Sequence, residues 1–169
     1  MKILAGQYKG LSIKTVSNAP YRPTKSRVRK SLFDKLSPFH YKSVLDLFSG
    51  SGIFGFEAAS RGAQQVTFVE KHRKTFHLIR ANSSQFNNTK FNYVCRDVFK
   101  YLTEYDESYD IIFADPPYGM VDLEILKNSV LPILNENGKF LLECERNQPE
   151  FDEATVTDYG DTRIQIWTK

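Results

Sequence analysis

Four consecutive residues, Asp115-Pro116-Pro117-Tyr118, have the composition expected of a site that grips a planar amine. Proline has no backbone N–H and a fixed φ, so two in succession hold the neighbouring carboxylate and carbonyl groups in set directions. An acid, a rigid carbonyl acceptor and an aromatic ring together suit a flat group with an exocyclic NH2. The tetrapeptide therefore indicates a nucleobase amine and methyl transfer to it.

The amine of guanine or adenine is a poor nucleophile because its lone pair is delocalised into the ring. If the Asp115 carboxylate and the Pro116 carbonyl each accept one N–H, the nitrogen moves toward tetrahedral geometry and the lone pair localises. Tyr118 can stack on the base, and Asp115 can help the proton leave after transfer. The alternative interpretation is a Pro-Pro turn with an Asx-type cap, which is common in loops.

A glycine-rich segment, residues 46–55, is the second candidate for chemistry. Gly50, Gly52 and Gly55 match the G-x-G-x-x-G pattern with which both NAD enzymes and S-adenosylmethionine (SAM) enzymes bind nucleotides. Asp46 favours SAM, because an ammonium and a sulfonium attract an acid whereas a pyrophosphate does not. A turn that only permits close packing of a helix on a strand is the alternative.

Two further acids follow the next two expected strands. Glu70 can accept both hydroxyls of a ribose, or it can pair with Lys71 or Arg73. Asp97 can accept an adenine amine next to the Val98 N–H, or it can cap the helix that follows. The three acids taken together indicate a ligand site more strongly than each one alone, since open α/β sheets bind ligands at the carboxyl ends of successive strands.

The apolar pattern predicts the elements that position these residues. Expected strands are 44–48, 66–70, 91–95, 111–114 and 139–143, and expected helices are 53–61, 73–86, a short one after residue 97, and 123–134. This alternation indicates a parallel sheet with right-handed crossovers. Residues 154–158 and 162–168 indicate a closing antiparallel hairpin.

The N-terminal region has a different pattern. Residues 2–6 and 11–16 indicate a hairpin, and residues 17–23 a loop. Thr24 or Ser26 can then cap a helix to about residue 36, with apolar residues at helical spacing. We expect residues 1–20 to form an extension that docks RNA and residues 21–169 to form the catalytic domain.

Composition limits the class of protein. The chain has 169 residues, of which 41% are hydrophobic and 14% aromatic, enough for the core of one α/β domain. No apolar stretch approaches membrane-spanning length and the start lacks a signal-peptide core, so we expect a cytoplasmic protein without a membrane partner. Cys95 and Cys144 are expected to be two buried thiols.

Positive charge is concentrated near the N-terminus. Residues 1–42 hold ten Lys and Arg against one acid, Asp34, a net charge of +9, while the remaining residues carry −6. This separation favours a polyanionic partner that docks through the N-terminal segment, in preference to a merely solvated basic face.

Five segments, taken in order, resemble those of the bacterial enzymes that methylate guanine N2 in 16S ribosomal RNA. They are residues 22–29, 46–52, 68–70, 115–118 and 159–162, and the resemblance covers essentially the whole chain. The acidic-Pro-Pro-aromatic motif is typical of amino methyltransferases generally. Arg22-Pro23-Thr24 is the segment that narrows the choice to this family.

The resemblance implies a Rossmann-like class I SAM-dependent methyltransferase. Its sheet would have seven mostly parallel strands with an antiparallel last strand, and an N-terminal hairpin would extend it. The substrate would be the assembled or assembling small ribosomal subunit, and we expect a monomer without a metal. The predicted cofactor-binding residues are Thr24, Arg27, Asp46, Phe48, Ser49, Gly50, Gly52, Glu70, Lys71, Asp97 and Val98, of which Thr24 and Arg27 would lie at the methionine end. The predicted RNA-binding residues are Lys2, Lys9, Lys14, Arg22, Arg29 and Lys30.

Two positions depart from the family pattern: Lys30 and His72 stand where an acid is expected. Neither change touches the core motifs. His40, His72 and His77 show no pattern that suggests a metal or catalysis, so we interpret them as ordinary side chains.

Other functions remain open at this point. A DNA adenine N6 or protein glutamine amide methyltransferase would use the same chemistry, although Asn in place of Asp115 is commoner in both. A SAM- or nucleotide-sensing RNA-binding protein would not use Asp115 at all. An NAD-linked dehydrogenase would leave the tetrapeptide at 115–118 unexplained.

Overall fold

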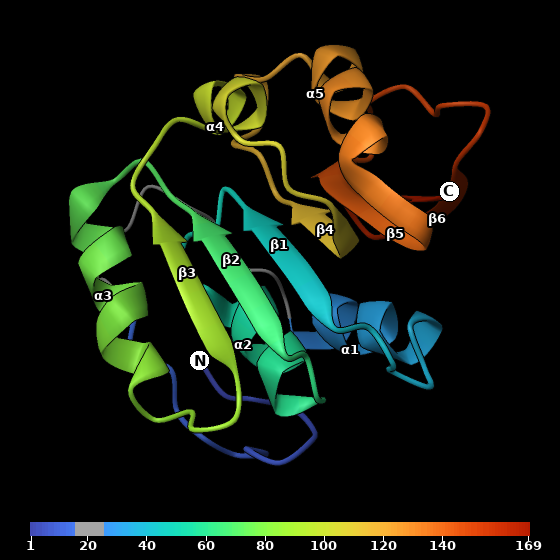
Figure 1. Cartoon of the computed structure of the whole chain (residues 1–169). Coiled ribbons are helices and arrows are strands. Elements are labelled where there is room, and N and C mark those ends of the chain that lie inside the picture. The colour runs from blue at the N-terminus through green and yellow to red at the C-terminus, as the bar shows by residue number, and fades with distance from the viewer. Residues whose placement is uncertain (16–25) are drawn as a thin grey trace.

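The computed structural model describes residues 1–15 and 26–169, and its centre is a seven-stranded sheet with the order β3-β2-β1-β4-β5-β7-β6 (Figure 1). The strands are β1 Ser43–Leu47, β2 Gln65–Val69, β3 Lys90–Val94, β4 Tyr109–Ala114, β5 Leu134–Glu145, β6 Thr155–Tyr159 and β7 Thr162–Thr168. The helices are α1 Ser26–Lys35, α2 Ile53–Ser60, α3 Arg73–Ser83, α4 Val98–Glu104 and α5 Leu123–Val130, with a 3-10 turn at Leu131–Ile133.

The strand pairing confirms the predicted sheet. Strands β3, β2, β1, β4 and β5 run parallel to one another, whereas β7 is antiparallel to both β5 and β6. Strand β1 pairs with β2 on one side and β4 on the other, so the chain order reverses across β1. Ligands of open α/β sheets bind at the carboxyl ends of the strands at such a reversal.

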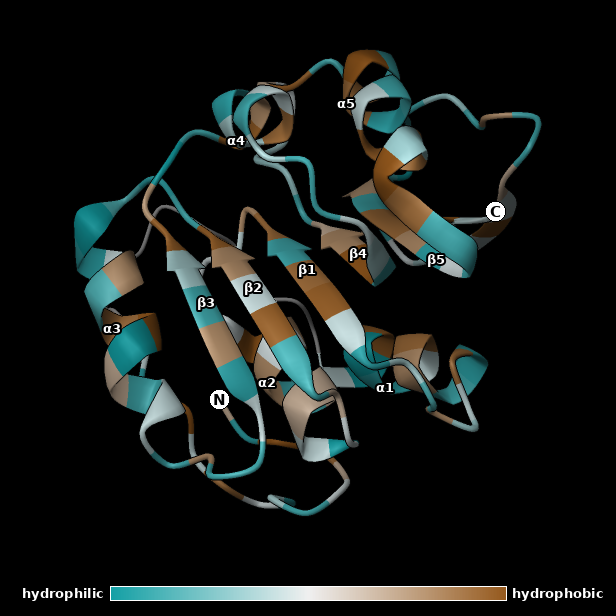
Figure 2. Cartoon of the chain, in the orientation of Figure 1, coloured by the Kyte–Doolittle hydropathy of each residue, from teal (hydrophilic) through white to brown (hydrophobic). Residues whose placement is uncertain are grey.

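Apolar side chains on the two faces of the sheet form two cores. One core contains Phe33, Phe56 and Phe68 beneath helices α1 and α2, and the other contains Ile112 and Trp167 near α4 and α5. Figure 2 shows the middle of β1 and β2 in hydrophobic colours, whereas α3 carries several hydrophilic bands. Burial on both faces explains why the central strands read as nearly continuous apolar runs.

Several predicted boundaries are wrong by a few residues. The helix expected to run to residue 134 ends at Val130 and continues as the 3-10 turn, because Pro132 has no N–H to donate. Helix α3 ends at Ser83, three residues earlier than expected, and β5 extends further in both directions than the predicted 139–143. Helix α1 buries Val28, Leu32 and Phe33, as the helical spacing predicts.

The N-terminal residues pair with each other without forming regular strands. The Ile3 N–H donates to the Leu11 carbonyl at 3.0 Å, the Ile13 N–H donates to the Met1 carbonyl at 2.7 Å, and Lys2 and Ser12 form an isolated antiparallel bridge. The predicted hairpin is therefore confirmed over residues 1–15. Its expected last residue, the loop at 17–23 and the domain boundary after residue 20 lie outside the described residues.

A buried carboxylate fastens this segment to helix α2. Glu57 is fully buried and accepts hydrogen bonds from the Leu4 N–H at 2.7 Å and the Ala5 N–H at 3.0 Å. It also lies 3.6 Å from the Arg29 guanidinium and 3.0 Å from that of Arg61. The N-terminal segment thus packs onto the α/β core through charged hydrogen bonds as well as through Ile3 and Ile13.

One of the two cysteines is buried, as the sequence predicts, and the other is not. Cys144 is buried, but Cys95 is exposed, because it follows the last residue of the edge strand β3. In the part of the chain that the structure describes, no helix is both long and apolar enough to cross a membrane.

Candidate active site

The turn after β1 has a conformation that depends on left-handed backbone. Phe48 has φ 54°, Gly50 φ 52° and Gly52 φ 72°, and a bulky residue such as Phe adopts this region rarely. The buried Ser49 hydroxyl donates to the carbonyls of Asp46 at 2.6 Å and Val69 at 3.1 Å, which closes the turn against β2. The turn is thereby held at the carboxyl edge of the sheet.

Two of the three glycines are required by packing. A Cβ on Gly55 would lie 2.4 Å from the Phe68 ring, and one on Gly52 would lie 2.9 Å from the Phe56 ring. Both distances are too short for a side chain, so α2 can approach the sheet this closely only with glycine there. The packing alternative therefore applies to Gly52 and Gly55, and it is compatible with a nucleotide at the same turn.

Asp46 lies beneath this turn. It is 1% exposed, and its Oδ2 accepts a hydrogen bond from the Gly55 N–H at 3.0 Å. Burial raises the pKa of Asp46 well above its usual value, and the Gly55 hydrogen bond only partly offsets this. A cation at the turn would favour the ionised carboxylate, as the predicted sulfonium and ammonium would.

Glu70 follows β2 and joins the turn to the start of α3. Its Oε2 accepts from the Gly50 N–H at 2.8 Å, and its Oε1 accepts from the His72 N–H at 2.7 Å. Each carboxylate oxygen keeps a further lone pair, so Glu70 can still accept from ribose hydroxyls. Among the described residues no ion pair joins Glu70 to Lys71 or Arg73.

Asp97 is the cap of helix α4, as the alternative interpretation expects. Its Oδ1 accepts from the Phe99 N–H at 3.1 Å, and Val98 beside it is buried. Capping uses one carboxylate oxygen and leaves the other available as an acceptor. The structural and the functional interpretations of Asp97 are therefore compatible.

Asp46 lies in β1, Glu70 directly follows β2, and Asp97 comes three residues after the end of the adjacent strand β3. Neighbouring strands lie about 4.8 Å apart, so the acids span the width of a nucleoside. This edge offers carboxylate acceptors to a ligand whose sulfonium, ammonium, hydroxyls and adenine amine are all cationic or donors. The residues present thus fit SAM, and they fit a pyrophosphate poorly because it would face like charge.

The tetrapeptide at 115–118 begins directly after β4. Asp115, Pro117 and Tyr118 are half-buried, and Pro116 is buried. The Met120 N–H donates to the Pro117 carbonyl at 3.2 Å, which closes the turn with Gly119 at φ 67°. Since β1 and β4 are paired up to Leu47 and Ala114, the tetrapeptide lies next to the glycine turn.

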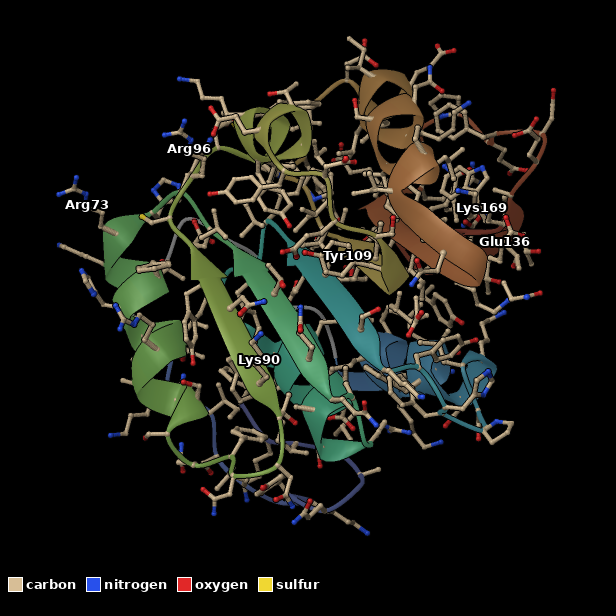
Figure 3. All side chains as sticks on the ribbon, in the orientation of Figure 1. Arg73, Lys90, Arg96, Tyr109, Glu136 and Lys169 are labelled. Carbon is tan, nitrogen blue, oxygen red and sulfur yellow. The ribbon has the colours of Figure 1, made fainter. Side chains whose placement is uncertain are left out.

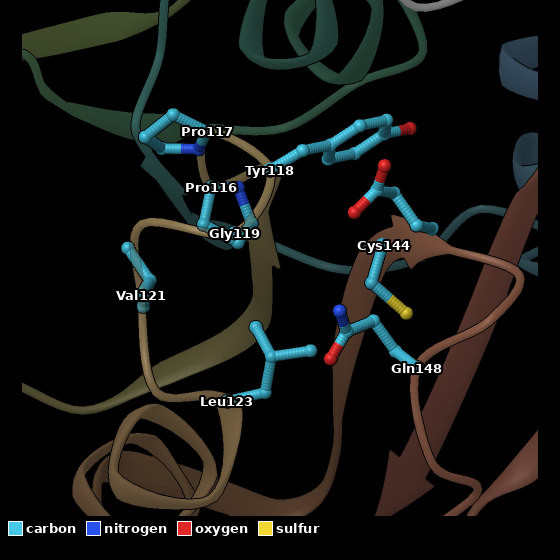
Figure 4. Close-up of a pocket in the computed structure, with 9 residues that line it drawn as sticks. Pro116, Pro117, Tyr118, Gly119, Val121, Leu123, Cys144 and Gln148 are labelled. Carbon is cyan, nitrogen blue, oxygen red and sulfur yellow. The ribbon is translucent and has the colours of Figure 1, made fainter.

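A small cavity lies behind the Pro-Pro turn. Residues of the turn, of the start of α5, of the end of β5 and of the segment after it line it, with Leu123, Cys144 and Gln148 across from the prolines (Figure 4). The empty space among these residues is about 230 Å3, part of which is open to solvent.

Glu143 is a buried acid at this edge that the sequence analysis missed. It is 5% exposed and follows Leu142, whose partner on β4 is Ala114, the residue before Asp115. The two carboxylates therefore occupy corresponding positions on neighbouring strands. An acid inside the apolar run 140–144 is the signal that could have revealed it.

The predicted RNA-binding residues do not all face solvent. Lys2, Lys9, Lys14 and Lys30 are exposed, and Lys30 pairs with Asp34 at 2.7 Å. The prediction for Arg29 is wrong, because this side chain is 1% exposed and donates to the Lys2 carbonyl at 2.7 Å. Its charge serves the buried contact with Glu57 and is unavailable to RNA.

The remaining predicted residues are partly described. Arg27 and Lys71 are exposed, while Arg22 and Thr24 lie outside the described residues. Within residues 1–15 and 26–169, no group of three or more His, Cys, Asp and Glu side chains could hold a metal ion.

Known proteins resemble this chain over its full length. The family model described as "Conserved hypothetical protein 95" matches residues 1–167. "Putative rRNA methyltransferase YlbH" of Bacillus subtilis is 32% identical over 184 residues, covering 100% of this chain and 99% of that protein. "Ribosomal RNA small subunit methyltransferase D" of Buchnera aphidicola subsp. Acyrthosiphon pisum is 34% identical over 154 residues, covering 86% and 78%. The solved structure "Putative methyltransferase yhhF from Escherichia coli" superposes with a TM-score of 0.84 and 25% identity, covering 100% and 97%.

Proposed function

Since this chain belongs to the conserved hypothetical protein 95 family, we propose that it methylates the exocyclic N2 amine of a guanine in 16S ribosomal RNA. Its broader activity is that of a SAM-dependent ribosomal RNA methyltransferase. The observation that carries the finer proposal is the placement of Asp115-Pro116-Pro117-Tyr118 at the carboxyl end of β4, next to the glycine turn.

SAM, when bound, supplies the methyl group as an electrophile. Asp46, Glu70 and Asp97 would hold it at the edge formed by β1, β2 and β3, with Phe48, Ser49, Gly50 and Gly52 forming the turn beneath. Lys71, Val98 and Arg27 complete the set of described residues that we assign to the cofactor, and Thr24 belongs to it by its place in the sequence.

The substrate amine would be gripped by the tetrapeptide. Asp115 accepts one N–H of the amine and the Pro116 carbonyl accepts the other, so the nitrogen lone pair localises on the side away from them. The turn uses the Pro117 carbonyl for Met120, and no hydrogen bond within the described part of the chain uses the Pro116 carbonyl. Tyr118 stacks on the guanine, and Asp115 takes part in removing the proton.

The RNA is proposed to be presented within the assembled or assembling small subunit. The exposed Lys2, Lys9, Lys14 and Lys30, together with Arg22, would contact its phosphates. We further propose that the protein acts as a monomer in the cytoplasm, where bacterial ribosomal subunits assemble.

Transfer of label from radioactive SAM tests this function. The purified protein is incubated with small-subunit particles that lack the modification, with naked 16S RNA and with DNA, and the product is digested to nucleosides. We expect label in N2-methylguanosine from the particles. Label in N6-methyladenine or in a protein glutamine would identify a different amino methyltransferase, and cofactor binding without product from any substrate would contradict catalysis.

A further inference from the structure

Helix α3 carries an uninterrupted basic face beside the candidate cofactor site. Residues 71–96 contain six Lys and Arg and no Asp or Glu. On α3 itself Arg73, Lys74, His77 and Arg80 are exposed, and we call these four residues the α3 face. Residues three and four apart share one side of a helix, so these side chains gather on the outer side of α3. Figure 3 shows Arg73 projecting from α3 away from the sheet.

The charges of the α3 face are available to an external partner. Across the described residues, ion pairs engage Arg29, Lys30, Arg61, Arg96, Arg146 and Arg163 but none of Arg73, Lys74 or Arg80. The Arg80 guanidinium lies 5.6 Å from the centre of the Tyr93 ring, which orients it without neutralising it. Unpaired, like charges on one face repel each other, and a polyanion would relieve this repulsion.

The α3 face is continuous with the basic N-terminal segment. The buried Asn82 side chain of α3 accepts from the Lys14 N–H at 3.0 Å and donates to the Lys14 carbonyl at 2.8 Å. The Asn87 N–H donates to the Tyr8 hydroxyl at 2.9 Å, and the Tyr8 and Phe86 rings lie 4.6 Å apart. The exposed Lys14 therefore lies beside α3, and two basic regions far apart in sequence form one surface.

This surface borders the edge of the sheet where the reaction would occur. Helix α3 begins three residues after Glu70, at the carboxyl end of β2. Only β1 separates β2 from β4, so Glu70 and Asp115 are about two strand spacings, or ~10 Å, apart across the sheet. Outside residues 1–42 and 71–96 the chain has seven Lys and Arg against nineteen Asp and Glu, which disfavours docking of RNA elsewhere.

We propose that the α3 face binds phosphates of the ribosomal RNA that flanks the target guanine. It would supply, with Lys14, a second docking surface besides the N-terminal lysines. The inference rests on the proposed function, because it names the part of this molecule that holds the same RNA. Phosphate contacts position a nucleic acid without reading its sequence, so the α3 face would contribute affinity and orientation.

The test compares two triple variants with the same change in charge. Arg73→Gln/Lys74→Gln/Arg80→Gln neutralises the α3 face, and Lys127→Gln/Lys139→Gln/Lys169→Gln removes three charges from α5, from the middle of β5 and from the residue after β7. Figure 3 places Lys169 on the opposite side of the molecule from Arg73. The KM for unmodified small-subunit particles, kcat, the salt dependence of particle binding and the Tm are measured for each.

We expect the α3 variant to raise the KM about 10-fold or more with kcat within about twofold, and to lower the slope of log K against log salt by about two to three. The control variant should keep the wild-type values. A KM and slope equal to wild type in the α3 variant, or equal losses in both variants at unchanged Tm, would overturn the proposal. Methylation by the wild-type protein tests the proposed function separately, and the binding slopes decide this inference even if that function fails.

Discussion

Asp115 is the residue on which the proposed chemistry depends. It follows the last residue of β4, is half-buried, and is held by a turn whose two prolines restrict the backbone. A carboxylate in this position can accept an N–H and later a proton, whereas an amide oxygen can accept only the N–H.

Replacing Asp115 should separate catalysis from cofactor binding. Asp115→Ala is expected to lower kcat about 100-fold or more, while the Kd for SAM stays within about twofold, because the proposed cofactor site lies over β1 to β3. Asp115→Asn should lose less, since its oxygen still accepts one N–H. Single-turnover methylation and calorimetric titration measure the two quantities, and a kcat within tenfold of wild type in the Ala variant would refute the role.

Glu70 tests the cofactor site at the same scale. Glu70→Gln keeps an acceptor for the Gly50 N–H but loses charge and one of the two accepting oxygens. A hydrogen bond to a charged group contributes about 1.5–3 kcal/mol, so the Kd for SAM should rise about 10-fold or more. Glu104→Gln, an exposed acid paired with Arg96, is the matched control and should leave this Kd unchanged.

At the scale of elements, the attachment of the N-terminal segment to α2 is the least expected feature. Glu57 collects two backbone N–H groups and two guanidinium groups at a fully buried position. Removing one partner of a buried charged network leaves the others uncompensated. The segment 1–15 should therefore depend on α2, although the Leu4 and Ala5 contacts with Glu57 span 53 and 52 residues of sequence.

Glu57→Ala is expected to lower the free energy of unfolding by about 3–5 kcal/mol. Glu57→Gln should cost less, because its amide oxygen still accepts a backbone N–H. Urea denaturation gives both values, and limited proteolysis should show earlier cleavage within residues 1–15 of the Ala variant. A loss below about 1 kcal/mol would mean that Glu57 does not hold the segment.

Helix α4 is attached to the sheet by two tyrosines, and this predicts a loss of stability in alkali. Burial raises the pKa of Tyr101 to about 12. Burial is also the main cause that raises the pKa of Tyr109, and the two hydroxyls lie 2.7 Å apart. Unfolded tyrosines ionise near pH ~10, so this contribution is complete below about pH 10 and is lost as the pH rises toward 12. The urea midpoint should fall over this range, and more gently in Tyr101→Phe. An equal fall in both proteins would contradict the assignment.

The sequence predicts the order and type of most elements because local periodicity determines them. Every parallel strand and the closing hairpin follow from apolar runs and turn residues, and the tetrapeptide at 115–118 needs no tertiary information to be recognised. Arg29, Cys95 and Glu143 were missed or misplaced, since their exposure depends on which strand forms the edge and on what packs over α1. The second role of Asp97 as a cap was foreseen only as an alternative.

At the scale of the whole molecule, charge is divided between two sides. The N-terminal lysines and the α3 face provide the positive surface, and the acids concentrate at the carboxyl edge and in the second half of the chain. The net charge of residues 43–169 is negative, because the acids after residue 96 outnumber the basic residues. This net charge hides the basic region at residues 71–96. This division gives a protein of net charge +3 a directed surface for a polyanion.

The most direct test of the central claim is to identify the methylated nucleotide. Small-subunit particles lacking the modification are incubated with the protein and SAM, and the 16S RNA is then mapped by mass spectrometry of its nuclease fragments. The account predicts one N2-methylguanosine at a single position, absent when Asp115→Ala replaces the wild-type protein. A methyl group on another atom or base, or unmodified 16S RNA after incubation with active, SAM-binding protein, would contradict it.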